Sequence, residues 1–101
     1  MHINRLFSKI KNMETINKEH TIQYIDENGT VLAEVEFPLT GDNEITITRT
    51  FVDDSLRGQG IASKLISEVL NVAKQHNYKI KATCSYAAHH FEKHPTDLYL
   101  K

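Results

Sequence analysis

Two glycines are the first residues of this chain whose placement suggests chemistry. Gly58 and Gly60 lie in the segment Arg57-Gly58-Gln59-Gly60-Ile61-Ala62, just before a stretch with helical periodicity. A helix N-terminus presents unpaired backbone N–H groups and a partial positive charge, and glycine lets a phosphate come close to the backbone. The segment therefore indicates a phosphate-binding turn, although a tight strand-to-helix turn with no ligand has the same pattern.

Cys84 is the only cysteine, so no intramolecular disulfide can form and a zinc cluster of paired cysteines is excluded. It ends an alternating stretch and stands just before a candidate helix. A helix N-terminus stabilises a thiolate, which favours a nucleophilic or acid role, whereas a buried cysteine at a strand end is often only a small hydrophobe. Tyr86 follows two residues later, and its phenol either protonates a leaving thiolate or packs.

Other polar residues have weaker patterns. Lys64 follows the glycine turn on the candidate helix, where it either contacts a phosphate or stays in solvent. His90 and His94 stand four residues apart, but Pro95 closes that short segment and no second cysteine is near. Such a pair is typical of a solvated helix face, and we expect no metal site.

The composition is that of a soluble globular domain. The 101 residues suffice for about one small domain, with 12 basic residues against 13 acidic ones and 40% hydrophobic residues. This balance gives no reason to expect a nucleic-acid partner. No apolar run reaches the roughly 18 residues that span a bilayer, and the single cysteine fits a reducing cytoplasm. We expect a cytoplasmic protein with no membrane partner.

The elements that must position these residues follow from hydrophobic periodicity. Residues 1–14 have helical spacing and form an N-terminal extension, interpreted as a terminal helix rather than a membrane or targeting helix. The domain proper spans residues 15–101. Alternation over 21–26 and 31–37 flanks Asn28-Gly29, the strongest short hairpin signal, and a third alternating run extends from Ile45 to Phe51.

After the third strand the hydrophobic periodicity changes from that of a strand to that of a helix. Residues 60–76 have a continuous apolar stripe without interior Gly or Pro, which predicts a helix closed by Asn77. Alternation from Tyr78 to Cys84 predicts a further strand, and a short helix capped by Ser85 follows over 86–94. A strand-helix-strand crossover places its two strands in parallel, so the fold class is α/β with a mixed sheet: an antiparallel meander plus one parallel strand.

The glycine segment resembles the pyrophosphate loop of the GNAT family of N-acetyltransferases: Gln or Arg, two residues, Gly, one residue, then Gly or Ala. Ala82-Thr83-Cys84-Ser85-Tyr86 and Phe91-Glu92-Lys93-His94-Pro95 resemble the short, roughly hundred-residue branch of that family, in which a cysteine stands near the thioester. One departure is Arg49 before Thr50, where the branch often has a histidine.

The resemblance implies that acetyl-CoA is the cosubstrate. Its pyrophosphate would lie on the loop, its pantetheine arm would pair with the backbone of the preceding strand, and its thioester would lie near Cys84. The residues implied in cofactor binding are Phe51, Val52, Arg57, Gly58, Gln59, Gly60, Ile61, Ala62 and Lys64, and those implied in catalysis are Cys84 and Tyr86.

The expected activity is acetyl transfer to an amine acceptor, which is a small molecule or a protein. The amine attacks acetyl-CoA directly, or Cys84 takes the acetyl group first. Two other classes of function remain open: a CoA or acyl-CoA binding module without turnover, and a phosphate or nucleotide binder that uses only the glycine turn.

Overall fold

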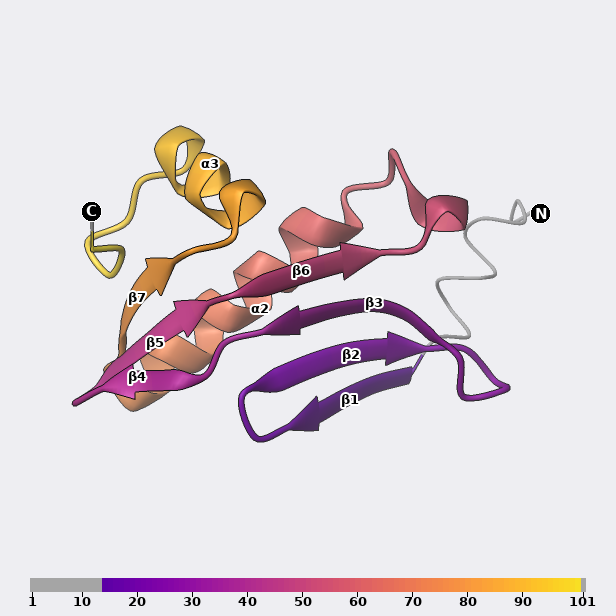
Figure 1. Cartoon of the computed structure of the whole chain (residues 1–101), viewed down its shortest axis with the longest axis horizontal. Helices are drawn as coiled ribbons and strands as arrows, with labels where there is room; N and C mark the ends of the chain where they lie inside the picture. Colours follow the sequence, from indigo (N-terminus) through magenta and orange to yellow (C-terminus); the bar gives the residue numbers. More distant parts are fainter. Residues whose placement is uncertain (1–13, 101) are drawn as a thin grey trace.

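Two adjoining sheets form the framework of the fold in the computed structural model, which describes residues 14–100 (Figure 1). The first sheet is antiparallel, has the order β1-β2-β3-β6, and contains β1 Glu14–Lys18, β2 Thr21–Ile25, β3 Val31–Glu36 and β6 Arg49–Val52. The second has the order β4-β5-β7 and contains β4 Leu39–Gly41, β5 Glu44–Ile47 and β7 Lys79–Ala82. The helical elements are η1 Asp54–Leu56, α2 Ile61–His76 and α3 Ser85–Lys93.

The hairpin expected at Asn28-Gly29 is confirmed between β2 and β3. A carboxylate oxygen of Asp26 accepts hydrogen bonds from the backbone N–H groups of Asn28 and Thr30, each at 2.9 Å. Gly29 has a φ of +83°, a left-handed conformation that other residues adopt at a cost. The sequence analysis missed β1, which pairs with β2 and is mostly exposed. A terminal helix is predicted for residues 1–14. Of these, Glu14 begins β1 instead, and residues 1–13 lie outside the described residues.

The predicted third strand is divided into β5 and β6. Thr48 interrupts it, and its N–H bonds the carbonyl of Glu36 at 3.0 Å. β5 pairs with β4 on one side and β7 on the other, whereas β6 pairs with β3. In Figure 1 the two strands follow one another in the same direction, so one chain segment belongs to both sheets.

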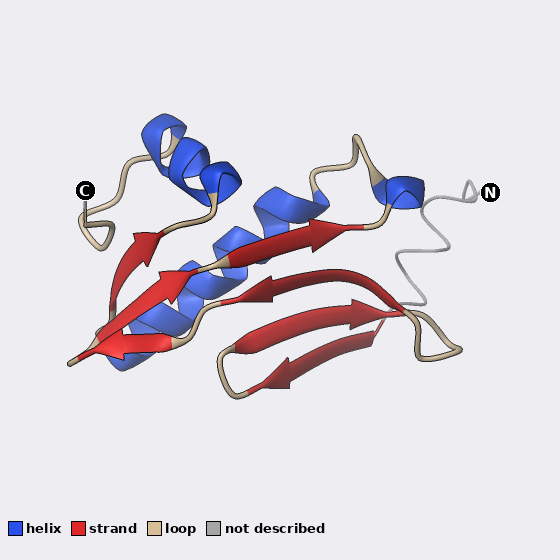
Figure 2. Ribbon diagram, viewed as in Figure 1, coloured by secondary structure: helices blue, strands red, loops and turns tan. Residues whose placement is uncertain are grey.

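Helix α2 covers one side of both sheets (Figure 2). It lacks interior Gly and Pro, and Asn77 ends it with a left-handed φ of 59° while its N–H bonds the carbonyl of Ala73. The helix packs against β3, β6 and β7 through a buried stripe of Ile61, Leu65, Ile66, Val69 and Ala73. This stripe and the buried residues of β2, β3, β5 and β7 form the core together with Phe37, Leu56 and, from α3, Ala87 and Phe91.

The crossover through α2 makes β5 and β7 parallel, as expected, with Ile45 opposite Ile80 and Ile47 opposite Ala82. Helix α3 differs in one detail from its prediction. Cys84, rather than Ser85, is the N-cap, because its backbone is extended while its carbonyl already accepts the N–H of Ala88 at 3.0 Å. The tail then returns beside β7 through a parallel bridge between Ile80 and Tyr99. No helix within residues 14–100 has the length and apolar character needed to cross a membrane.

Candidate active site

The glycine turn lies between β6 and α2 and is fixed by the acidic residues before it. Asp53 caps the short helix η1 and accepts hydrogen bonds from the N–H and the hydroxyl of Ser55. Arg57 pairs with Asp54 at 2.9 Å, and both side chains are largely exposed. Leu56 is fully buried and anchors the turn to the core. These contacts fix the start of the glycine turn, which then leads into α2.

Gly58 and Gly60 both have positive φ values, 82° and 72°, and Gly60 is the N-cap of α2 without a side-chain cap. A methyl group built at either position would meet nothing within 4 Å, so there is open space over the backbone. The first intrahelical bond runs from the N–H of Lys64 to the carbonyl of Gly60, which leaves the amides before Lys64 without an intrahelical acceptor. A phosphate fits this arrangement of amides and space.

The turn forms one wall of a shallow hollow of about 220 Å³, and α3 reaches the same hollow through Tyr86. Its other lining residues are Val52, Leu56, Arg57, Gly58, Gly60, Ile61 and Ala62. Tyr86 is 42% exposed, unusually much for a large aromatic side chain in this fold. The structure thus brings together the glycine turn and Tyr86, which are separate in the sequence.

The edge of β6 that faces away from β3 has no strand partner among the described residues. Asp53 donates its N–H to the carbonyl of Leu32, and antiparallel pairs alternate, so Phe51 also directs its backbone groups toward β3. By the same alternation, Thr50 and Val52 direct theirs toward the unpaired edge. The register therefore favours Val52 over Phe51 as a backbone partner for a ligand.

Cys84 lies where β5, β6 and β7 separate. The N–H groups of Thr83 and Cys84 both bond the carbonyl of Ile47, at 3.0 and 3.2 Å, which ends the pairing between β5 and β7. The sulfur of Cys84 lies 3.5 Å from the hydroxyl oxygen of Thr50, and the residue is only half-buried.

Two opposing effects act on the Cys84 thiol. Its burial raises the pKa, and hydrogen bonds to the sulfur lower it. The largest of these bonds involves the Thr50 hydroxyl, and further ones come from the backbone N–H groups of Ala87, Tyr86 and Thr50. The hydrogen bonds prevail, so the pKa of Cys84 lies below its ordinary value. A thiolate is the more nucleophilic form of cysteine.

Thr50 is the functional candidate that the sequence analysis missed. Its hydroxyl meets Cys84 only because β5 and β7 pair in parallel and because the chain passes from β5 into β6 after Ile47. The alternation of the third strand places Thr50 on the face opposite Phe51, but nothing in the sequence indicates which residue of another strand faces it.

Gln59 and Lys64 have distinct environments. The side-chain oxygen of Gln59 is buried and has no hydrogen-bond partner among the described residues. A buried amide oxygen normally has a donor, so this atom has room for a donor from outside residues 14–100. The ammonium of Lys64 lies over the ring of Tyr24, 5.5 Å from its centroid, and Lys64 does not line the hollow.

The histidine pair lies on α3, with the rings of His90 and His94 4.7 Å apart. Burial, and secondly the neighbouring His94, lower the pKa of His90. Within residues 14–100, no three His, Cys, Asp or Glu side chains are placed to hold a metal ion.

Comparison with known proteins identifies the family. Residues 21–100 match the family described as GCN5-related N-acetyl-transferase. The match covers both the glycine turn and Cys84, so this chain belongs to the GCN5-related N-acetyltransferase (GNAT) family. No curated protein is significantly similar to the chain.

Solved structures agree with this assignment. A GCN5-like protein from Staphylococcus aureus is 38% identical, has a TM-score of 0.75, and aligns over 88% of this chain and 89% of its own. A GNAT family N-acetyltransferase from Escherichia coli, in complex with CoA, is 26% identical with a TM-score of 0.51, over 59% of this chain and 37% of its own. Ard1 from Thermoplasma volcanium, 22% identical with a TM-score of 0.59 over 75% of this chain and 53% of its own, shares the fold.

Proposed function

We propose that this protein binds acetyl-CoA and transfers the acetyl group to an amine acceptor. The observation that carries the proposal is the meeting of the glycine turn and Tyr86 at one hollow, with Val52 directing backbone groups to the same unpaired edge. Cys84 precedes Tyr86 by two residues and carries a thiol of lowered pKa. The CoA complex of the Escherichia coli relative supports the choice of cosubstrate.

The residues of the turn fit CoA. The open space over Gly58 and Gly60 and the uncapped start of α2 suit a pyrophosphate. The Gln59 oxygen has no donor within residues 14–100, and a ligand or its water would supply one. Backbone groups of Val52 would bond the pantetheine arm as a strand partner would. Arg57 is exposed at the rim of the hollow, where its charge favours an anion.

Acetyl-CoA, when bound, supplies an activated acyl group as a thioester. We propose that the Cys84 thiolate attacks the acetyl carbon, while the carbon–sulfur bond to CoA breaks and that sulfur leaves with the electron pair. Tyr86 donates its phenolic proton to the departing sulfur. The amine then attacks the acetyl group on Cys84, releases the thiolate, and returns one proton to the Tyr86 phenolate, which restores both residues.

The donors around Cys84 favour this route over direct attack by the amine. Hydrogen bonds from Thr50 and from the first amides of α3 stabilise the thiolate at the start and again when the acetyl group has left. In direct transfer, Cys84 would only protonate the leaving sulfur, and that role needs the protonated thiol, which these hydrogen bonds disfavour.

The experiment is intact-protein mass spectrometry after incubation with acetyl-CoA alone, followed by peptide mapping. We expect one acetyl group on Cys84, none in Cys84→Ala, and unchanged CoA affinity in that variant because the phosphate turn is elsewhere. Adding an amine mixture should remove the adduct, release CoA and give an acetylated amine. If no adduct forms and Cys84→Ala slows turnover by about 10²- to 10⁴-fold, the covalent route is wrong. The amine then attacks acetyl-CoA directly, and Cys84 acts as the acid that protonates the leaving sulfur.

The non-catalytic alternative is separated by the same assay. A CoA or acyl-CoA binding module would bind acetyl-CoA through contacts that depend on Gly60. It would release no CoA in the presence of any amine. Full turnover in Cys84→Ala would leave Cys84 as a packing residue and remove its proposed role.

A further inference from the structure

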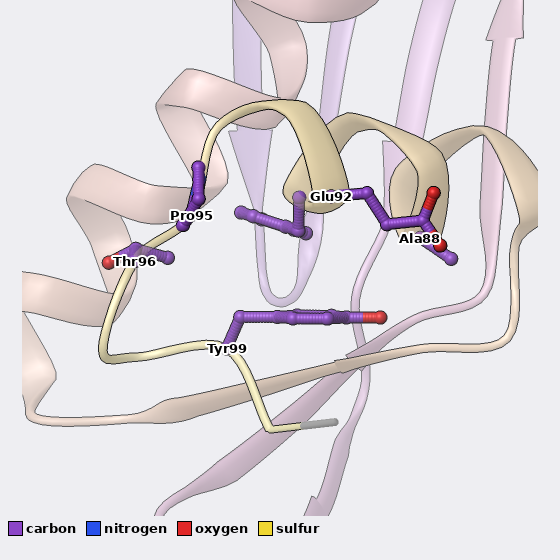
Figure 3. A pocket seen from close by; sticks show the side chains of 6 residues that line it. Ala88, Glu92, Pro95, Thr96 and Tyr99 are labelled. Carbon is purple, nitrogen blue, oxygen red and sulfur yellow. The ribbon is translucent and has the colours of Figure 1, made fainter.

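A second cavity lies apart from the glycine turn, between α3 and the C-terminal tail (Figure 3). We call it the tail slot; its volume is about 400 Å³, and it is lined by Ala88, Phe91, Glu92, Pro95, Thr96 and Tyr99. Cavities of this size hold small organic molecules. None of these residues takes part in the steps proposed above.

The walls of the tail slot are apolar and fixed in position. The rings of Phe91 and Tyr99 stack with centroids 4.6 Å apart and an angle of 18°, and Phe91 is buried. The bridge to Ile80 and the hydrogen bonds of Ile80 with Leu98 and Leu100 hold the tail on either side of Tyr99. The stacked pair of Phe91 and Tyr99 is therefore a firm apolar wall, and an aromatic or alkyl group in the slot can pack against the surface that the pair leaves uncovered.

The slot is polar at one end. In Figure 3 the Tyr99 ring extends across the slot, its hydroxyl points to the same side as the Glu92 carboxylate, and both lie toward Ala88. Among the described residues, the largely exposed Glu92 carboxylate pairs with His89 at 3.6 Å. A carboxylate and a phenol beside an apolar floor are complementary to a cation on an apolar body, which points to an ammonium group.

This polar end is also the end nearer to Cys84. The N–H of Ala88 bonds the carbonyl of Cys84 at 3.0 Å, so the two residues are separated by one helical turn, a rise of about 6 Å. An amine that enters the slot with its apolar part on Tyr99 would hold its nitrogen at the mouth on the Cys84 side.

We propose that the tail slot binds the amine acceptor and that the acceptor class is a cationic amine carrying an aromatic ring or an alkyl chain. This inference rests on the proposed acetyl transfer for its second half, the use of the bound amine as acceptor. The Glu92 carboxylate attracts the ammonium, and Tyr99 contacts the apolar part. Before the nitrogen attacks the acetyl group, the ammonium releases one proton to solvent water, and the second proton that the amine loses on attack goes to the Tyr86 phenolate. The first half, binding of the amine in the tail slot, does not depend on the proposed acetyl transfer.

Binding is tested with 2-phenylethylamine by NMR titration of the full chain, with 2-phenylethanol and ethylamine as probes that lack the charge and the ring. We expect saturable shifts at the amides of Ala88, Phe91 and Tyr99 with phenylethylamine, and weaker binding of both controls. Glu92→Gln should weaken phenylethylamine binding by about threefold, as for an exposed ion pair, and Tyr99→Leu by about fivefold. Glu27→Gln, an exposed carboxylate in the β2–β3 turn, is the matched control and should change nothing.

Shifts that fall elsewhere, or equal affinities for phenylethylamine and phenylethanol, would overturn the assignment of the slot to an amine. The acceptor role is tested by acetylation kinetics, in which Glu92→Gln should raise KM for phenylethylamine and leave kcat unchanged. If amines are acetylated but ethylamine serves as well as phenylethylamine, the slot is not the acceptor site. If the slot binds phenylethylamine but no amine is acetylated, the proposed transferase activity fails and the binding site stands.

Discussion

At the scale of single residues, the pair of Cys84 and Thr50 determines what the site can do. Replacing Thr50 by Val removes the hydroxyl with little change in volume, so the sulfur loses one hydrogen-bond partner and the thiolate becomes less stable. The pKa of Cys84 should therefore rise, and the pH midpoint of its alkylation by iodoacetamide, followed by mass spectrometry, should move to higher pH.

Thr83→Val is the matched control for that measurement, because Thr83 adjoins Cys84 but its side chain is exposed and is not among the groups within residues 14–100 that bond the sulfur. Its midpoint should equal that of the unchanged protein. An unshifted midpoint in Thr50→Val would mean that the backbone amides of α3 and of residue 50 stabilise the thiolate without the hydroxyl.

The sequence predicts correctly that Cys84 stands just before a helix, because hydrophobic periodicity and composition are local properties. The predicted strand reaches Cys84, whereas β7 ends at Ala82. It does not predict Thr50, whose contact with Cys84 depends on the parallel register of β5 and β7. It also treats Phe51 and Val52 alike, although the pairing of β6 with β3 distinguishes their backbone groups. Contacts between strands depend on register, and alternation alone leaves the register open.

At the scale of elements, the start of α2 carries the CoA proposal, and Gly60 tests it. Gly60→Ala places a methyl group in the open space over the turn, and we expect CoA affinity to fall by about tenfold, or about 1.4 kcal/mol. The measurement is isothermal titration calorimetry on the folded variant, since the positive φ of Gly60 also makes alanine costly for stability.

Gly29→Ala separates the loss of CoA affinity from the loss of stability. Gly29 has a similar φ of +83°, also has open space around it, and lies in the β2–β3 turn outside the hollow. Both variants should lose comparable stability, but only Gly60→Ala should lose CoA affinity. Equal affinities in the two variants would show that the glycine turn does not bind the pyrophosphate.

A second contact between elements joins β2 to α2. The Tyr24 hydroxyl donates to the carboxylate of Glu68, and burial is the main reason that the pKa of Tyr24 is raised. Tyr24→Phe should lower the free energy of unfolding by about 1 kcal/mol, the usual net value of such a bond. Urea denaturation measures this, and Tyr78→Phe, whose hydroxyl has no hydrogen bond within residues 14–100, should change it less. An equal loss in both variants would assign the effect to the ring environment.

At the scale of the whole molecule, the division into two sheets is what opens the site. The sequence predicts the β2–β3 hairpin, the crossover and the parallel pair, because Asn28-Gly29, the stripe of α2 and the alternation of β7 each specify a local structure. It does not predict β1 or β4. The break at Thr48 has no such signal, since Thr46, Thr48 and Thr50 continue one alternation. The break follows from which strands β5 and β6 pair with, a property of the assembled fold.

The distribution of buried residues along the chain predicts how much of the chain the site needs. Every buried hydrophobic residue of the described core lies between Ile22 and Phe91, and β1 contributes none. A chain that begins at Glu14 keeps β1 as the partner of β2 and should therefore fold and bind CoA with the affinity of the full chain.

Thermal unfolding and calorimetric titration with CoA measure both properties. A chain that begins at Thr21 also loses β1 and leaves the edge of β2 unpaired, so it should unfold at a lower temperature and tend to associate through that edge. Its CoA affinity should persist wherever it remains folded, because β1 is the strand farthest from β6 in their sheet. Loss of folding or of CoA binding in the chain that begins at Glu14 would show that residues 1–13 complete the core.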